Sequence, residues 1–295
     1  MTAKDSLLAA FVLIAWGVTF LFMRMSLNEV SPMVLGMLRF LLLMFPAVFI
    51  LPRPQVAWYW LVSYGLAISF GQFSLLFISL HLGMPTGLAA LLHQSQVFFT
   101  VLLAALLLHE PIRRNHVAAM MLAAAGLMLI GIGQHQGAVP WAAMFASFGA
   151  AAAWAAGNIM VKFIGKVNAL SLVVWGNISS LLAFSAASWW LYGAEGVWRQ
   201  ISGMSWLGIT GVAFLAYVAG LFGYAGWGAL LSRYESGKVA PLSLLVPVIA
   251  LLVAKLFLNE YMNGWHWAGV LVVMFSLLVQ VFGGRLKWFN PEKIG

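Results

Sequence analysis

Long apolar runs alternate with short polar breaks along the whole chain, and several breaks contain proline or glycine, as at 51–54, 83–85 and 109–111. Most runs hold about 20 residues, the length that an α-helix needs to cross the roughly 30 Å hydrocarbon core of a bilayer. They are too long and too uniformly apolar for barrel strands, so they predict transmembrane helices. The ten predicted spans are residues 6–23, 32–51, 57–80, 86–108, 115–133, 139–162, 170–191, 204–231, 238–258 and 264–283.

The two halves of the chain repeat each other's spacing. The first and sixth spans each carry three residues spaced by four, namely Trp16, Phe20 and Arg24 in one and Trp154, Asn158 and Lys162 in the other. The same offset of 138 carries Arg39 onto Asn177, and a later offset of 150 carries Glu110 onto Glu260. Because five spans is an odd number, the second half enters the membrane from the opposite side. We therefore predict an all-α integral membrane fold of two inverted five-helix repeats, 1–136 and 137–295, an arrangement found in alternating-access carriers.

Composition agrees with a membrane protein. The 295 residues are 63% hydrophobic and only 7% charged, against about 25% charged in soluble domains. The absence of cysteine excludes disulfides, thiolate metal sites and cysteine nucleophiles. A net charge of +8 would suggest nucleic acid in a soluble chain, but here it indicates Lys and Arg in cytoplasmic loops. We expect no nucleic-acid partner, no metal and no cofactor.

Acidic residues are missing from the middle of every predicted span. All seven lie in tails, loops or span ends: Asp5, Glu29, Glu110, Glu195, Glu235, Glu260 and Glu292. The usual proton or sodium relay is therefore absent, and export of cationic drugs is disfavoured. Without clustered Asp, Glu, His or metal ligands, we expect no catalytic residues and no enzyme. A channel is the other class of membrane protein that has to be distinguished from a carrier.

Arg39 is the strongest candidate for a binding residue. It lies seven residues into a span, or about 10 Å deep at 1.5 Å per residue. An intramembrane charge is a functional hypothesis by default. The alternative is a structural arginine that snorkels outward or binds backbone carbonyls. If Arg39 faces a cavity, it suits a substrate with a carboxylate.

The fourth span carries His93, Gln96 and Thr100 on one helical face, with Gln94 pointing elsewhere. This stripe lines either a cavity or a helix contact. His93 either couples protons or is hydrogen-bonded within the bundle. Gln72 and Asn158 are similar cavity candidates, whereas Asn177 and Gln280 equally suit contacts between helices.

Aromatic residues, glycines and prolines add further candidates. Trp16 and Trp154 lie mid-span and either wall a cavity or pack in the core. Gly223 next to Tyr224 permits close helix contact or a hinge, and Pro241 and Pro247 permit a hinge in the ninth span. The predicted substrate-binding residues are Trp16, Arg39, Gln72, His93, Gln96, Trp154, Asn158 and Tyr224, and the predicted gating residues are Gly223, Pro241 and Pro247.

Several segments resemble the EamA-type members of the drug/metabolite transporter superfamily. They are Ala15-Trp16-Gly17, Leu38-Arg39-Phe40, the Glu110 and Glu260 positions, and the stretches 94–100 and 233–247. The resemblance implies a secondary transporter of the bacterial inner membrane that exports small amino-acid-like metabolites. The family also carries other solutes, so export of hydrophobic drugs, pigments or aromatic metabolites is the alternative. Facilitated diffusion and proton exchange both stay open, and the sequence predicts no oligomeric state.

The distribution of Lys and Arg predicts that both termini face the cytoplasm. Eleven lie in the tails and even-numbered loops: Lys4, Arg53, Arg113, Arg114, Lys162, Lys166, Arg233, Lys238, Arg285, Lys287 and Lys293. Only Arg24, Arg199 and Lys255 lie on the other side. A green fluorescent protein fused to the C-terminus should fluoresce, and an alkaline phosphatase fused there should be inactive. An active phosphatase fusion would contradict this orientation.

Overall fold

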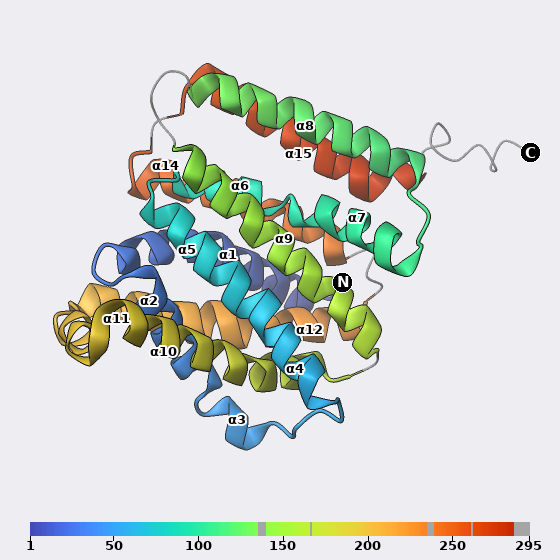
Figure 1. The fold of residues 1–295 in the computed structure, drawn as a ribbon. Helices are drawn as coiled ribbons and strands as arrows, with labels where there is room; N and C mark the ends of the chain where they lie inside the picture. Colours follow the sequence, from blue (N-terminus) through green and yellow to red (C-terminus); the bar gives the residue numbers. More distant parts are fainter. Residues whose placement is uncertain (135–139, 166, 235–238, 261, 286–295) are drawn as a thin grey trace, which may run out of the picture.

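The computed structural model describes residues 1–134, 140–165, 167–234, 239–260 and 262–285, and every regular element in these ranges is helical (Figure 1). The all-α class is thus confirmed, and a described helix occupies each predicted span. The elements are α1 (Ala3–Leu27), α2 (Pro32–Met44), α3 (Ala47–Ile50), α4 (Trp58–Gly65), η1 (Leu66–Gly71), α5 (Gln72–His81), α6 (Thr86–His93), α7 (Gln96–Leu108), α8 (Arg114–Gln134), α9 (Trp141–Ile164), α10 (Ala169–Ser202), α11 (Trp206–Ala213), η2 (Phe214–Phe222), α12 (Gly223–Arg233), η3 (Ala240–Leu244), α14 (Leu245–Phe257), α15 (Gly264–Phe282) and η4 (Gly283–Arg285).

Eight helical stretches in the described residues are long and apolar enough to cross a membrane by length and composition. They are Ala3–Leu27, Pro32–Ile50, Trp58–His81, Thr86–Leu108, Trp141–Ile164, Ala169–Ser202, Trp206–Leu230 and Gly264–Phe282. Two more apolar helices, Arg114–Ile130 and Leu242–Phe257, are shorter than that length. The count of ten spans and their inverted arrangement therefore stay predictions.

Polar side chains at the helix starts satisfy amide groups that the helices leave unpaired. The Thr2 hydroxyl accepts a hydrogen bond from the Asp5 amide, and Asn168 and Asn263 accept from amides in the first turns of α10 and α15. Pro32 begins α2, where its missing N–H has no partner to lose. Such caps offset the cost of leaving backbone donors unpaired in lipid.

Two helix ends share the same backbone conformation. His109 follows α7 and Asn259 follows α14, with φ values of 54° and 50° in the left-handed region. The next amide, of Glu110 or Glu260, donates to a carbonyl six residues earlier, Ala104 or Ala254. These ends lie 150 residues apart, which is the offset that the sequence predicts for this part of the two halves.

Several spans depart from the α-helix near their middle. The third predicted span passes through the π-helical segment η1, and the eighth passes through η2. The fourth is broken between α6 and α7 at Gln94 and Ser95. Segments of π-helix are frequent at functional sites because they reposition side chains and free carbonyl groups.

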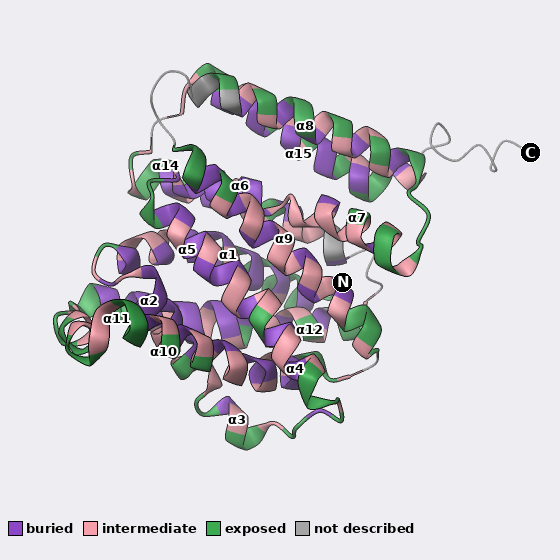
Figure 2. Ribbon diagram, in the orientation of Figure 1, coloured by how far each residue is buried: buried purple, intermediate pink, exposed green. Residues whose placement is uncertain are grey.

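The helices pack into one bundle, and Figure 2 shows buried residues, in purple, along most of its helices. Helix α1 contacts α14 on one side and α11, η2 and α12 on another, whereas α9 contacts α5, η1, α6 and α7. Helix α2 packs along α10. Large exposed hydrophobic residues such as Leu106, Phe145 and Trp190 cover the outside, which suits a surface facing lipid.

Helices α8 and α15 run side by side at one edge of the bundle (Figure 1). They cross at Gly126 and Gly269, where backbone meets backbone. A Cβ atom on Gly269 would lie 2.6 Å from the Gly126 carbonyl oxygen, and one on Gly126 would lie 2.9 Å from that of Gly269. This contact therefore requires glycine on both helices.

We expect Gly269→Ala to lower the free energy of unfolding by about 1–3 kcal/mol, because the added methyl group must push the two helices apart. The measurement is thermal unfolding of the purified protein in detergent. Gly228→Ala is the matched control, since nothing lies within 4 Å of a Cβ at that position. Equal loss of stability in both variants would refute the close contact.

Candidate binding cavity

A cavity of about 340 Å³ lies in the bundle, within the range of roughly 300–1,000 Å³ typical of small-molecule sites. Its lining comes from both halves of the chain and from spans far apart in the sequence. All eight predicted substrate-binding residues line it: Trp16, Arg39, Gln72, His93, Gln96, Trp154, Asn158 and Tyr224. The structure thus brings them together, while their contact with a substrate stays a prediction.

Arg39 is buried in this wall, with 3% of its surface exposed. Its guanidinium carbon lies 3.7 Å from the centre of the Phe73 ring, a cation–π contact. Its Nε and Nη1 atoms have no hydrogen-bond partner among the described residues. Arg39 therefore does not snorkel to the surface, and these two donors bind no backbone carbonyl.

The described carboxylates are engaged elsewhere. Three form ion pairs, which are Asp5 with Arg233 at 2.7 Å, Glu110 with Lys162 at 2.7 Å and Glu195 with Arg199 at 3.0 Å. Glu29 accepts from the Ser205 amide and hydroxyl at 2.7 Å each. Glu260 accepts from the Thr86 and Gly87 amides, at 2.6 and 3.1 Å, at the start of α6. Among the described residues, which exclude Glu235 and Glu292, no carboxylate neutralises Arg39.

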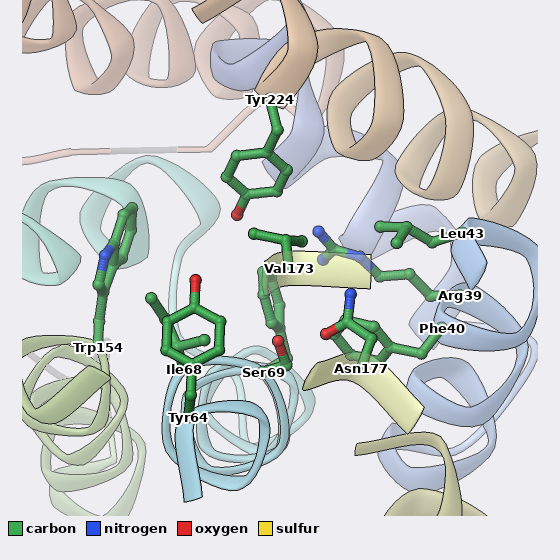
Figure 3. A pocket seen from close by; sticks show the side chains of 11 residues that line it. Arg39, Phe40, Leu43, Tyr64, Ile68, Ser69, Trp154, Val173, Asn177 and Tyr224 are labelled. Carbon is green, nitrogen blue, oxygen red and sulfur yellow. The ribbon is translucent and has the colours of Figure 1, made fainter. Parts of the chain in front are cut away.

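A smaller pocket of about 40 Å³ adjoins the cavity and shares Arg39, Phe73, Trp154 and Tyr224 with it. Figure 3 shows the side chains of Arg39 and Tyr224 directed toward this space from different helices, with Asn177 beside Arg39. The sequence left Asn177 open between a cavity residue and a contact between helices, and neither of its amide atoms has a partner among the described residues.

Polar side chains across the cavity bind each other. The Gln72 amide nitrogen lies 3.1 Å from Nε2 of His93, so His93 is hydrogen-bonded within the bundle. The Asn158 amide donates to Gln96 at 3.1 Å and to Thr100 at 3.2 Å. The first contact connects α5 with α6, and the second pair connects α9 with α7.

The prediction that Gln94 points away from the polar stripe is wrong. Gln94 lines the cavity and its amide donates to the Ser243 carbonyl at 3.4 Å. The expectation assumed a continuous helix, whereas α6 ends at His93 and α7 begins at Gln96. The break rotates Gln94 relative to ideal helical spacing.

Trp16 is held in the wall by two features of the eighth span. Its indole nitrogen donates to the Ala219 carbonyl at 3.0 Å, inside η2. A Cβ on Gly223 would lie 2.6 Å from the same nitrogen, so only glycine leaves room for the ring. The rings of Tyr224 and Trp227 lie 5.8 and 5.2 Å from that of Trp16, forming an aromatic cluster.

The predicted gating residues have the following places. Gly223 makes the close contact with Trp16. Pro247 is buried in the first turn of α14, and Pro241 belongs to the 3₁₀ segment η3, with its side chain outside the described residues. The ninth span changes from 3₁₀ to α-helix at Leu245, between these prolines. A hinge movement at these residues stays a prediction.

Sequence reasoning missed the apolar part of the lining and Trp227. Phe20, Met23, Phe73 and Leu76 line the cavity but look like ordinary span residues in the sequence. Trp227 lies three residues after Tyr224, so helical spacing could have placed both on one face. In the described residues no group of three or more His, Cys, Asp or Glu side chains could hold a metal ion.

An all-helical bundle with membrane-length apolar helices and a polar cavity inside is the architecture expected of a small-molecule membrane transporter. The chain belongs to the EamA-like transporter family, whose model matches residues 4–132 and 141–282. A solved crystal structure has the same fold, with a TM-score of 0.64 at 18% identity over 97% of this chain and 98% of the other.

Curated relatives extend over nearly the whole chain. Proteins of Salmonella typhimurium and Escherichia coli K12, each named "Probable amino-acid metabolite efflux pump", are 41% and 38% identical to it. The alignments cover 97% of this chain and 98% of the first protein, and 100% of both chains for the second. Protein PecM of Dickeya dadantii is 24% identical over 90% of this chain and 88% of its own length.

We expect Gly223→Ala to displace the Trp16 indole and break its bond to Ala219. The free energy of unfolding should fall by about 1–3 kcal/mol, and the near-ultraviolet circular dichroism of tryptophan should change. In a Trp16→Phe background the same substitution should cost less, because the clashing nitrogen is gone. The control is Gly228→Ala on the same helix. If the cost of Gly223→Ala were independent of Trp16, the proposed contact would be wrong.

Proposed function

We propose that the protein is a secondary transporter of the bacterial inner membrane that exports small amino-acid-like metabolites by alternating access. The observation that carries the proposal is Arg39, a buried cation on the cavity wall without a carboxylate partner among the described residues. A buried charge is strongly favoured to gain a counter-ion. A substrate carboxylate supplies one.

The rest of the cavity suits the other end of a zwitterion. No described carboxylate lines it, so a substrate ammonium group needs another kind of partner. The faces of Trp16, Tyr224 and Trp227 provide one through cation–π attraction. The amides of Gln72, Gln96 and Asn158 add donors and acceptors. The names of the two closely similar efflux pumps support the same class of cargo.

Alternating access rests on ten spans in two inverted repeats, 1–136 and 137–295. Three observations support this arrangement. The first span of each half makes corresponding contacts. In the first half α1 contacts α14 of the ninth span and α11–α12 of the eighth, and in the second half α9 contacts α6–α7 of the fourth span and α4–α5 of the third. Both π-helical segments lie in the third span of a half, and both left-handed ends follow the fourth. The family model matches in two ranges that nearly coincide with the halves.

Export of hydrophobic drugs, pigments or other aromatic metabolites is the second candidate. It is supported by the apolar wall of Phe20, Met23, Phe73 and Leu76. Such solutes need not carry a carboxylate that pairs with a buried arginine. The two candidates therefore differ in whether binding of the solute depends on Arg39. A cytoplasmic location of both termini belongs to the proposal as well and follows from the distribution of Lys and Arg.

We expect proteoliposomes containing the purified protein to show saturable counterflow of at least one member of a panel of radiolabelled L-amino acids and their O-acyl and thiol derivatives. Arg39→Gln should raise the half-saturating concentration about tenfold or more, because a charge-assisted hydrogen bond is lost. Arg199→Gln is the control, since the side chain of that arginine is exposed and forms an ion pair with Glu195.

Two outcomes would go against the proposal. Wild-type protein that transports none of the panel, but does transport hydrophobic dyes, would favour the second candidate. Unsaturable flux without counterflow would indicate a channel rather than a carrier.

A further inference from the structure

Asn177 on α10 has a buried side-chain amide without a hydrogen-bond partner for either of its polar atoms among the described residues. Only 1% of its surface is exposed, and the two atoms are Nδ2 and Oδ1. Buried polar groups nearly always have partners, and lipid offers none. An amide of this kind therefore points to a bound species.

Beside it in the small pocket is Arg39, a buried side chain whose Nε and Nη1 donors also have no partner among the described residues. Most of the remaining wall is apolar or aromatic, with Phe40, Leu43 and Val173 among its members. The pocket thus offers hydrogen-bond donors from two neighbouring side chains, and the hydroxyl groups of Tyr64, Ser69 and Tyr224 also line it (Figure 3). These donors match a small anionic acceptor.

The size and place of the pocket fit one functional group rather than a whole solute. A water molecule needs roughly 10–15 Å³ of such space, and the pocket holds about 40 Å³. That admits a group of a few heavy atoms. Because the pocket shares Arg39, Trp154 and Tyr224 with the main cavity, a ligand can place one end in it and the rest outside.

We propose that this pocket is the carboxylate subsite of the transporter and that Asn177 is a substrate-binding residue. One carboxylate oxygen accepts from the Arg39 guanidinium and the other from Nδ2 of Asn177. The rest of the solute extends into the main cavity, toward the aromatic cluster. This inference rests on the proposed function and adds to it a residue and a requirement for a free carboxylate.

The chemistry of position 177 gives a sharp test. Asn177→Asp places a protein carboxylate opposite Arg39, which fills the subsite with an internal counter-ion. Asn177→Leu removes the amide without supplying a charge. The offset of 138 relates Arg39 to Asn177 in the sequence, and both residues line the small pocket.

The experiment measures thermal shifts and equilibrium binding of the full-length protein in detergent with each L-amino acid and its α-carboxamide. We expect wild type to prefer free carboxylates about tenfold or more. Asn177→Leu should weaken carboxylate binding by a similar factor, weaken carboxamide binding less, and so reduce the preference for free carboxylates. Asn177→Asp should abolish carboxylate binding and raise the melting temperature of the ligand-free protein.

Asn115→Leu is the matched control. It removes a buried amide that donates to the Gln280 carbonyl between α8 and α15, away from the cavity. It should lower the melting temperature without altering the preference for carboxylates. If wild type binds amino acids and both Asn177 variants keep that preference, the subsite is refuted and the proposed function stands. If wild type binds no amino acid in the panel, the proposed function itself fails.

Discussion

The hydrocarbon core of a bilayer contains no water, so each polar group inside it needs a partner from the protein or from a ligand. The helices meet this constraint for the backbone, and side chains meet it where helices begin or deviate. The Trp16 indole binds a carbonyl of η2, and the Ser180 hydroxyl binds the Gly65 carbonyl at 2.8 Å where η1 begins. Against this background, the unpaired donors of Arg39 and the unpaired amide of Asn177 lie together in one pocket, a place where the described residues alone do not satisfy the constraint.

Glycines let this polar interior form, because they bring helices close enough for specific contacts. Gly223 admits the Trp16 ring, and Gly126 and Gly269 allow α8 and α15 to touch through their backbones. The first contact shapes a wall of the cavity, whereas the second holds together a helix pair at the edge of the bundle. The same residue type thus has a role in binding in one place and a role in stability in the other.

Hydrophobic run length was enough to place a helix in each expected range, because crossing lipid imposes a length that sequence shows directly. Polar residues inside those runs were equally visible, and all eight selected residues line one cavity. The apolar lining was not predictable, since Phe73 or Leu76 in a cavity wall looks the same in sequence as one facing lipid. Gln94 was misplaced because nothing in the sequence indicated that α6 ends at His93. The π-helical segments were missed for the same reason.

Glu110 and Glu260 follow the two left-handed residues His109 and Asn259, and their carboxylates lie in different electrostatic surroundings. Glu260 is bound by two backbone amides of α6, which no side-chain substitution short of proline removes. Glu110 pairs with Lys162 through side chains that are 49% and 43% exposed, where solvent and dissolved salt weaken the attraction. Ionic strength therefore acts unequally on the two ends of the molecule. A rise in salt weakens the ion pair of Glu110 with Lys162, while the hydrogen bonds of Glu260 with the α6 amides are retained.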